Sequence, residues 1–257
     1  MPNDDSFFGK KVFFLNPPAV FSEVLPVLIE AEYEIYTTRD HAKLGRYLRR
    51  NPDCLVFVNI DEGDDERVWR TWIRSIKDDE ASAATRFGII TMMADDAKKQ
   101  TYIMDIGIEC GFIVVKIGAA KATEVILRML EANEAKGRRK YVRTICPEES
   151  ADFSCKTSAG LLRGPLKDLS SAGMATGFSD GLAPGTGTRL KDLQLNLKGA
   201  RVILSGVIIG GRDDDLKGPT RVIMFEPGSL NDDKRSKLRN FVRKLLQTKM
   251  EQELAQV

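Results

Sequence analysis

The first half of the chain alternates between two hydrophobic periods, and this alternation restricts the fold more than any other feature. Five short apolar runs are typical of buried strands, at 11–15, 34–38, 54–60, 87–93 and 111–117. A segment with helical spacing of apolar residues follows each run, at 22–31, 41–50, 64–79, 95–107 and 119–136. Strands that alternate with helices pair in parallel through crossover connections. The sequence therefore predicts an α/β doubly wound parallel sheet.

Local signals support several of these helices. Asp40 is placed as the N-cap of the 41–50 helix. Gly107 is expected to end the 95–107 helix. The 64–79 helix should bury one apolar stripe, made of Val68, Trp69, Trp72, Ile73 and Ile76.

The second half has a different pattern, with short β-rich segments separated by glycine and proline. The candidate strands are 153–157, 164–170, 189–197, 201–211 and 220–226. In the third of these, Leu193, Leu195 and Leu197 alternate with polar residues, which is the period of a half-buried strand. Such spacing predicts a small antiparallel β-barrel.

Two further segments complete the second half. The glycine-rich stretch 177–188 contains no GxGxxG and is interpreted as a loop between strands. The segment 232–255 is predicted to be a helix that packs through the stripe Leu238, Phe241, Val242, Leu245 and Leu246. Its many Lys and Arg residues favour a solvated face over a nucleic-acid patch.

Length indicates the number of domains, and charge restricts the classes of partner. A chain of 257 residues suits two domains, and we place the boundary near 134–142, giving domains 1–134 and 135–257. Hydrophobic residues are 42% and charged residues 30%, as in soluble globular proteins. The formal net charge of +2 indicates neither nucleic acid nor an anionic membrane as a partner. An anion site must therefore come from local clustering.

Metal and catalytic chemistry find little support. Cys54 and Cys110 lie in apolar runs, while Cys146 and Cys155 are nine positions apart, unlike a C-x-x-C zinc site. The single histidine, His41, has no second histidine to join as a ligand. We therefore expect no metal site and no disulfide framework. We also expect no enzyme activity, because there is no Ser/His/Asp set and no P-loop.

The N-terminus lacks signal-peptide character and no apolar run spans a bilayer, so a cytoplasmic protein without membrane insertion is expected.

A basic cluster stands out in this nearly neutral chain. The segment 136–143 contains five basic residues, Lys136, Arg138, Arg139, Lys140 and Arg143. Guanidinium groups match phosphate oxygens bidentately and stack on flat aromatic surfaces. On charge alone, a charged interdomain linker is the simpler interpretation.

A second motif changes that interpretation. The string 168–173 combines the carboxylate of Asp168, the hydroxyl of Ser170 and a glycine, Gly173, that permits close backbone approach or a positive φ. A carboxylate can accept hydrogen bonds from a guanine edge. The string alone is an ordinary turn, but it follows the Arg139-x-x-x-Arg143 pair at the entrance to a predicted barrel.

These two motifs together resemble the PilZ domain, the bacterial receptor for cyclic di-GMP. The resemblance covers about residues 137–250 and includes the doubled Arg138-Arg139, the later run ending in Phe225 and the closing helix. It implies a six-stranded antiparallel barrel with a C-terminal helix. It also implies that Arg139 and Arg143, assisted by Arg138, clasp phosphates and guanine faces. Asp168, Ser170 and Gly173 would face the guanine edge, and no cofactor is needed.

The first domain is similar to a response-regulator receiver, a flavodoxin-like fold, but departs from that family's chemistry. Asn16-Pro17-Pro18 replaces the acidic pair that holds magnesium, and Asn59 occupies the position of the phosphorylated aspartate. Thr91 and Lys116 match the family's pattern but are also ordinary residues for strand ends. A pseudo-receiver for dimerisation or partner docking is favoured. Asp61 is the only nearby candidate phosphoacceptor.

Three functions follow as hypotheses. The leading one is a non-enzymatic cyclic di-GMP receptor in which binding ties the linker to the barrel and changes domain orientation. The signal would pass to an unidentified downstream protein in motility, adhesion, polysaccharide or virulence control. The alternatives are a phosphorylation-controlled response regulator and a protein-interaction adaptor without a small-molecule ligand.

Overall fold

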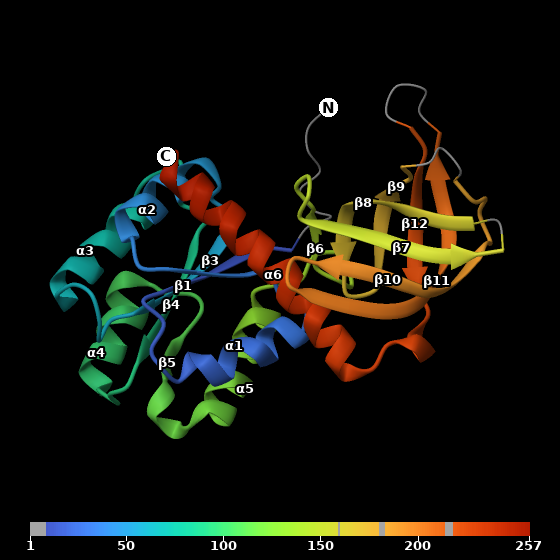
Figure 1. The fold of residues 1–257 in the computed structure, drawn as a ribbon. Helices are drawn as coiled ribbons and strands as arrows, with labels where there is room; N and C mark the ends of the chain where they lie inside the picture. Colours follow the sequence, from blue (N-terminus) through green and yellow to red (C-terminus); the bar gives the residue numbers. More distant parts are fainter. Residues whose placement is uncertain (1–8, 159, 180–182, 214–217) are drawn as a thin grey trace. The chain divides into compact units, whose positions relative to one another are not determined.

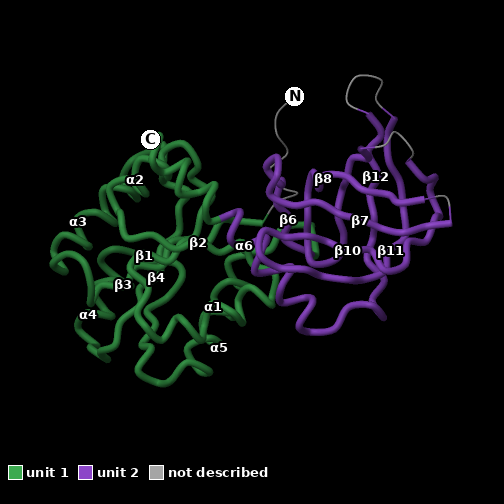
Figure 2. The backbone as a smooth tube through the Cα atoms, viewed as in Figure 1, with its two compact units in different colours: residues 1–140, 247–257 green, residues 141–246 purple. Residues whose placement is uncertain are grey.

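A computed structural model of the chain describes residues 9–158, 160–179, 183–213 and 218–257. The chain divides into two compact units (Figure 2). One contains residues 1–140 and 247–257, and the other contains residues 141–246. The final helix contributes residues to both units, because the division falls within it.

The first unit contains five strands in the order β2-β1-β3-β4-β5, and every pairing is parallel. The helices of the unit lie around this sheet (Figure 1). The elements alternate along the chain: β1 (Lys11–Leu15), α1 (Phe21–Glu30), β2 (Ile35–Thr38), α2 (His41–Arg50), β3 (Cys54–Asn59), α3 (Glu66–Lys77), β4 (Arg86–Thr91), α4 (Asp96–Gln100), β5 (Phe112–Val114) and α5 (Ala119–Ala132). The predicted doubly wound sheet is confirmed, with the flavodoxin-like strand order.

Burial explains why the apolar runs form strands. Every residue of β3 is buried, as are all residues of β1 after Lys11. Parallel strands covered on both faces form near-continuous apolar runs. Helix α1 contacts α5, and α2 contacts α3. Val24 and Leu28 of α1 and Ile126 of α5 share one core cluster with the sheet.

The helix starts follow the sequence signals. The carboxylate of Asp40 accepts a hydrogen bond from the backbone N–H of Lys43 at 2.9 Å, so the predicted N-cap of α2 is confirmed. Asp65 and Asp95 cap α3 and α4 in the same way.

Two elements near β4 and β5 differ from the prediction. The helix predicted over 95–107 is α-helical only through Gln100 and continues as a π-helical turn, η2 (Thr101–Ile106). It ends as expected at Gly107, which has φ 71°. The strand predicted over 111–117 stops at Val114, and a 3-10 turn, η3 (Val115–Ile117), follows. Apolar periodicity identifies a helix but does not choose between closely related hydrogen-bond patterns.

The predicted stripe of α3 is partly correct. Trp69, Ile73 and Ile76 are buried, but Val68 is 41% exposed. Val68 lies at the edge of the stripe, where the sequence gives no boundary between the buried and solvated faces.

The second unit is an antiparallel β-barrel. Its strands are β6 (Arg143–Ile145), β7 (Ala151–Thr157), β8 (Gly160–Ser170), β9 (Gly173–Gly177), β10 (Arg189–Leu197), β11 (Ala200–Arg212) and β12 (Thr220–Phe225). Six of them neighbour one another in the order β8-β7-β10-β11-β12-β9, and pairing of β9 with β8 closes the ring. Strand β6 adds a short seventh strand beside β8. The predicted six-stranded barrel, followed by a C-terminal helix, α6 (Asp232–Ala255), is confirmed.

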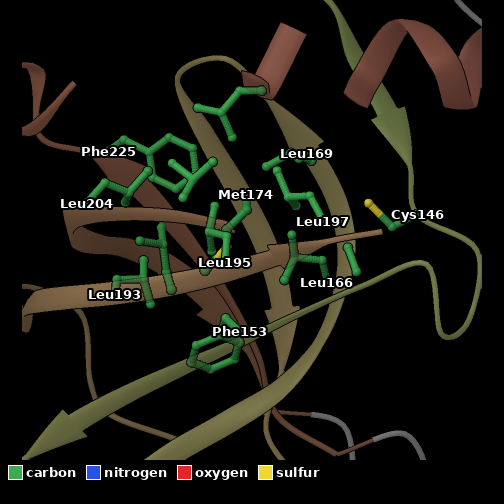
Figure 3. Packing of buried hydrophobic residues seen from close by; sticks show 14 of the residues in the cluster. Cys146, Phe153, Leu166, Leu169, Met174, Leu193, Leu195, Leu197, Leu204 and Phe225 are labelled. Carbon is green, nitrogen blue, oxygen red and sulfur yellow. The ribbon is translucent and has the colours of Figure 1, made fainter. Parts of the chain in front are cut away.

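Alternate residues of the strands fill the barrel (Figure 3). Leu193, Leu195 and Leu197 of β10 point inward and are at most 1% exposed, as their spacing predicted. They meet Phe153 of β7 and Phe225 of β12 in one cluster. Opposing strands thus contribute large side chains to one continuous core.

The first part of α6 belongs to this core. Leu238, Phe241 and Val242 are buried in it, and Leu245 and Leu246 pack against it. The predicted stripe of the closing helix is therefore a packing face.

The sequence prediction missed two strands. Strand β6 has only three residues, and β9 has the sequence GMATG, in which glycines reduce the intrinsic preference for strand. Tertiary packing determines both. The loop predicted over 177–188 begins with the last residue of β9, and residues 180–182 lie outside the described residues.

No helix within the described ranges combines the length and apolar character needed to cross a membrane.

Candidate functional site

Strand β6 brings the two sequence motifs together within the second unit. It pairs antiparallel with the end of β8, so that Arg143 lies opposite Ser170 and Ile145 lies opposite Asp168. Arg143 and Asp168 are therefore diagonal neighbours on adjacent strands. Their side chains form an ion pair, with Arg143 Nη1 3.6 Å from Asp168 Oδ2.

The ion pair lies on the outer face of the barrel. The side chains of Arg143 and Asp168 are 37% and 24% exposed, whereas Leu169 between the motif positions points into the core. A soluble ligand can reach both charged groups from solvent.

A β-bulge sets the direction of the Asp168 carboxylate. Leu166 pairs with Thr176 and Asp168 with Ala175, which leaves Lys167 as the extra residue of β8. Asp168 Oδ1 accepts a hydrogen bond from the backbone N–H of Ala175 at 3.1 Å. One carboxylate oxygen is thus held by β9, while the other faces Arg143.

Ser170 shapes the turn between β8 and β9. Its Oγ accepts hydrogen bonds from the backbone N–H groups of Ala172 at 3.3 Å and Gly173 at 3.2 Å, and it donates to the Gly173 carbonyl at 3.1 Å. The residue is 3% exposed. In this structure the hydroxyl holds the turn closed, so its contribution to a ligand site is the position of the turn.

A glycine at position 173 could serve a close backbone approach or a positive φ. The structure shows the close approach. A Cβ at Gly173 would lie 2.6 Å from the carbonyl oxygen of Ile223 on β12. Its φ is not among the positive values found at other glycines. The packing of β9 against β12 therefore excludes a side chain here.

Arg138 and Arg139 lie in the irregular segment between α5 and β6. They are among the last residues of the first unit, which extends to Lys140, whereas Arg143 belongs to the second. Arg139 therefore belongs to the first unit and Arg143 to the second.

Two neighbours of the site were not anticipated from sequence. Lys167 Nζ donates a hydrogen bond to Thr220 Oγ1 on β12, which places a cation beside Asp168 on β8. Burial, and then the negative charge of Asp168, raises the pKa of the Cys146 thiol to about 12. Both contacts depend on pairings between distant strands, and no local pattern in the sequence signals them.

The polar residues of the first unit also lie at strand ends. Buried Asn59 donates through Nδ2 to the carbonyl oxygen of Asn16 at 2.8 Å. Asp61 Oδ1 accepts a hydrogen bond from Thr91 Oγ1 at 2.8 Å, and Oδ2 accepts one from the backbone N–H of Met92. The candidate phosphoacceptor is therefore already bonded to the end of β4. Lys116 lies exposed in η3.

Among the residues that the structure describes, no group of three or more His, Cys, Asp or Glu side chains is arranged to hold a metal ion.

Comparisons with known proteins gave partial structural likenesses. No family model matches the chain, and no curated protein matches it. The PilZ domain with c-di-GMP of YcgR from Escherichia coli aligns at 18% identity and TM-score 0.40, covering 47% of this chain and 99% of that one. The MrkH–c-di-GMP complex of K. pneumonia aligns at 15% identity and TM-score 0.38, covering 46% of this chain and 57% of that one.

A further likeness involves a response regulator from Thermotoga maritima, at 17% identity and TM-score 0.37, which covers 48% of this chain and 99% of that one. The chain spans only about half of the longer proteins, 50% of YcgR in complex with c-di-GMP and 57% of MrkH.

Proposed function

We propose that this chain is a non-enzymatic receptor for cyclic di-GMP, and that the ligand binds on the outer face of the barrel at the Arg143–Asp168 pair. One observation carries the proposal. The two halves of the motif, 25 positions apart in sequence, meet as an exposed ion pair at 3.6 Å. A chance basic linker followed by an ordinary turn would have no reason to meet in this way.

The chemistry of the two side chains suits the two parts of the ligand. A guanidinium donates forked hydrogen bonds to phosphate and stacks on a purine face. A carboxylate accepts from the N1 and N2 donors of guanine. Binding exchanges partners: Arg143 turns from Asp168 to the ligand, and Asp168 Oδ2 accepts from the base. Asp168 Oδ1 keeps its bond to Ala175, so the carboxylate stays oriented during the exchange.

Arg138 and Arg139 belong to the same proposed site through the spacing of the sequence motif. They add positive charge for the two phosphates of the ligand. Charge-assisted hydrogen bonds contribute about 1.5–3 kcal/mol each.

Calorimetric titration of the full chain with cyclic di-GMP tests the proposal. Arg139→Ala, Arg143→Ala and Asp168→Ala should each weaken binding by about tenfold or more, since each removes a charge-assisted contact of roughly 1.5–3 kcal/mol. Arg201→Ala is a matched control, because Arg201 is an exposed arginine of β11 outside the proposed site. Its affinity should equal that of the wild type.

Unfolding curves of all variants show whether a variant that loses affinity is still folded. Absence of binding by the wild-type chain would refute the function. Unchanged affinity in the three site variants would refute the site.

The position of the arginines also suggests how ligand binding produces a signal. Residues 138–142 lie in irregular backbone that leads into β6, and ligand contacts to Arg138 and Arg139 would fix the conformation of this segment. The proposal is that this fixed conformation changes the relative orientation of the units and presents a new surface to a downstream protein. Small-angle scattering with and without ligand tests it, and identical curves at saturation would contradict it.

A further inference from the structure

The outer face of the barrel continues past the motif as a row of residues across four strands. Gly173 of β9 pairs with Met224 of β12, and Met224 pairs with Val207 of β11. Val207 in turn pairs with Arg189 of β10. Directly opposed residues of antiparallel strands point to the same face of the sheet. These positions therefore lie side by side, over three strand steps of about 4.8 Å each.

The residues next to Met224 and Val207 in their own strands show that this row lies on the outer face of the barrel. Ile223 and Phe225, on either side of Met224, point into the barrel core, and so does Ile208 beside Val207. Met224 and Val207 must point outward. Met224 is 51% exposed and Val207 is partly exposed.

A second row runs parallel to the first and begins at the motif carboxylate. Asp168 pairs with Ala175 of β9, and Ala175 pairs with Val222 of β12. Val222 is two residues from Met224 and points to the same outer face. We call Met224, Val222 and Val207 the apolar floor. Met224 lies directly beside Gly173, and Ala175 separates Val222 from Asp168.

Positive charge borders the apolar floor. Beyond Val207, the Arg189 side chain is 68% exposed and forms an ion pair with Glu226 at 2.7 Å. Beside Val222, Lys167 reaches Thr220. Arg143 lies across the motif turn from Met224. Single exposed apolar side chains are ordinary, but this group is continuous with the proposed site and bordered by cations.

We propose that the apolar floor holds a purine base of the bound dinucleotide, face down, with Arg189 at its far edge. The inference rests on the proposed function and extends its site beyond the two motifs. A purine is flat and apolar on its faces, and apolar side chains that cover such a face remove its surface from water. The methionine thioether is polarisable and adapts to an aromatic face. The dianionic backbone of the ligand complements the bordering cations.

Met224→Glu tests the floor in the full chain. A carboxylate there would face the base and the phosphates, so affinity for cyclic di-GMP should fall about tenfold or more. Met224→Leu should retain affinity within about twofold, because it conserves size and apolarity. Ile203→Glu is the charge-matched control. Ile203 is 45% exposed on β11 and pairs with Gln194, outside the floor.

A second measurement does not depend on affinity. With methyl-labelled methionine, the Met224 methyl resonance should move on saturation with cyclic di-GMP because of the ring current of the base. The resonance of Met174, which is buried in the barrel core, serves as the internal reference.

The outcomes separate the two proposals. If the wild type binds and Arg143→Ala weakens binding, but Met224→Glu behaves like Ile203→Glu and the Met224 resonance does not move, the floor is refuted and the receptor function stands. If the wild type does not bind, the receptor function fails and the floor fails with it.

Discussion

At the scale of single residues, the motif positions separate into two kinds. Arg143 and Asp168 present charges to solvent, whereas Ser170 and Gly173 hold the turn that positions the carboxylate. The resemblance of the two motifs to the PilZ domain proposes the set. It could not predict this division, because the direction of Ser170 depends on turn hydrogen bonds and the need for glycine depends on β12, some 50 positions later.

Substitution of Gly173 by alanine should destabilise the second unit. Its Cβ would lie 2.6 Å from the Ile223 carbonyl, so strands β9 and β12 would have to separate. Overpacking of this kind costs about 1–3 kcal/mol of unfolding free energy. Denaturant unfolding measures it. Gly185→Ala is the control, since nothing lies within 4 Å of a Cβ there, and equal stability of the two variants would contradict the account.

At the scale of elements, the backbone N–H and C=O groups on the open side of an edge strand need hydrogen-bond partners. Strand β2 is an edge of the parallel sheet, and its unpaired side is partly satisfied within the first unit by a side chain of α6. The Gln247 amide accepts from Thr37 N–H at 3.1 Å and donates to the Thr37 carbonyl at 2.9 Å. The Gln247 side chain thus makes the pair of hydrogen bonds that a neighbouring strand would make with Thr37. The sequence predicted both elements, but a contact across 210 positions has no local signature.

Gln247→Leu should therefore expose the edge of β2. We expect faster hydrogen exchange at the Thr37 amide, and a loss of about 1–3 kcal/mol if the freed backbone groups remain partly buried. Exchange measured by NMR or mass spectrometry reports it directly. Gln252→Leu, at an exposed position of the same helix, should leave the exchange rate unchanged. Equal protection of Thr37 in both variants would show that the pairing does not form.

At the scale of the whole molecule, the two units differ in how much of them the sequence predicts. The alternation of the first half predicts the parallel sheet because each crossover is local. The barrel was predicted as a class, but the short strand β6 and the glycine-bounded strand β9 were missed, and both carry or border residues of the proposed site. Their formation depends on pairing with β8 and β12, which local preferences do not determine.

Four buried thiols give the molecule a shared response to alkaline pH. Burial raises the pKa of Cys54, Cys110 and Cys146 to about 12, and raises that of Cys155. In the unfolded chain a thiol loses its proton near pH 8.5. The native thiols stay protonated, so this contribution to stability is complete below about pH 8.5 and is lost as pH rises toward 12.

Unfolding free energy at about pH 7 and about pH 10 measures this effect, which is at most about 1.4 kcal/mol per thiol for each pH unit. Other groups also titrate in this range, so the comparison is with Cys110→Ala. The stability of that variant should fall less between the two pH values than that of the wild type. An equal fall would show that Cys110 does not contribute.

We infer that the exposed Arg143–Asp168 pair marks a binding site for cyclic di-GMP. Competition binding with labelled cyclic di-GMP on the full chain measures this. We expect saturable binding that unlabelled cyclic di-GMP displaces and that GMP and GTP do not, and we expect Arg143→Ala to abolish it. Absence of saturable binding, or equal displacement by GTP, would refute the assignment.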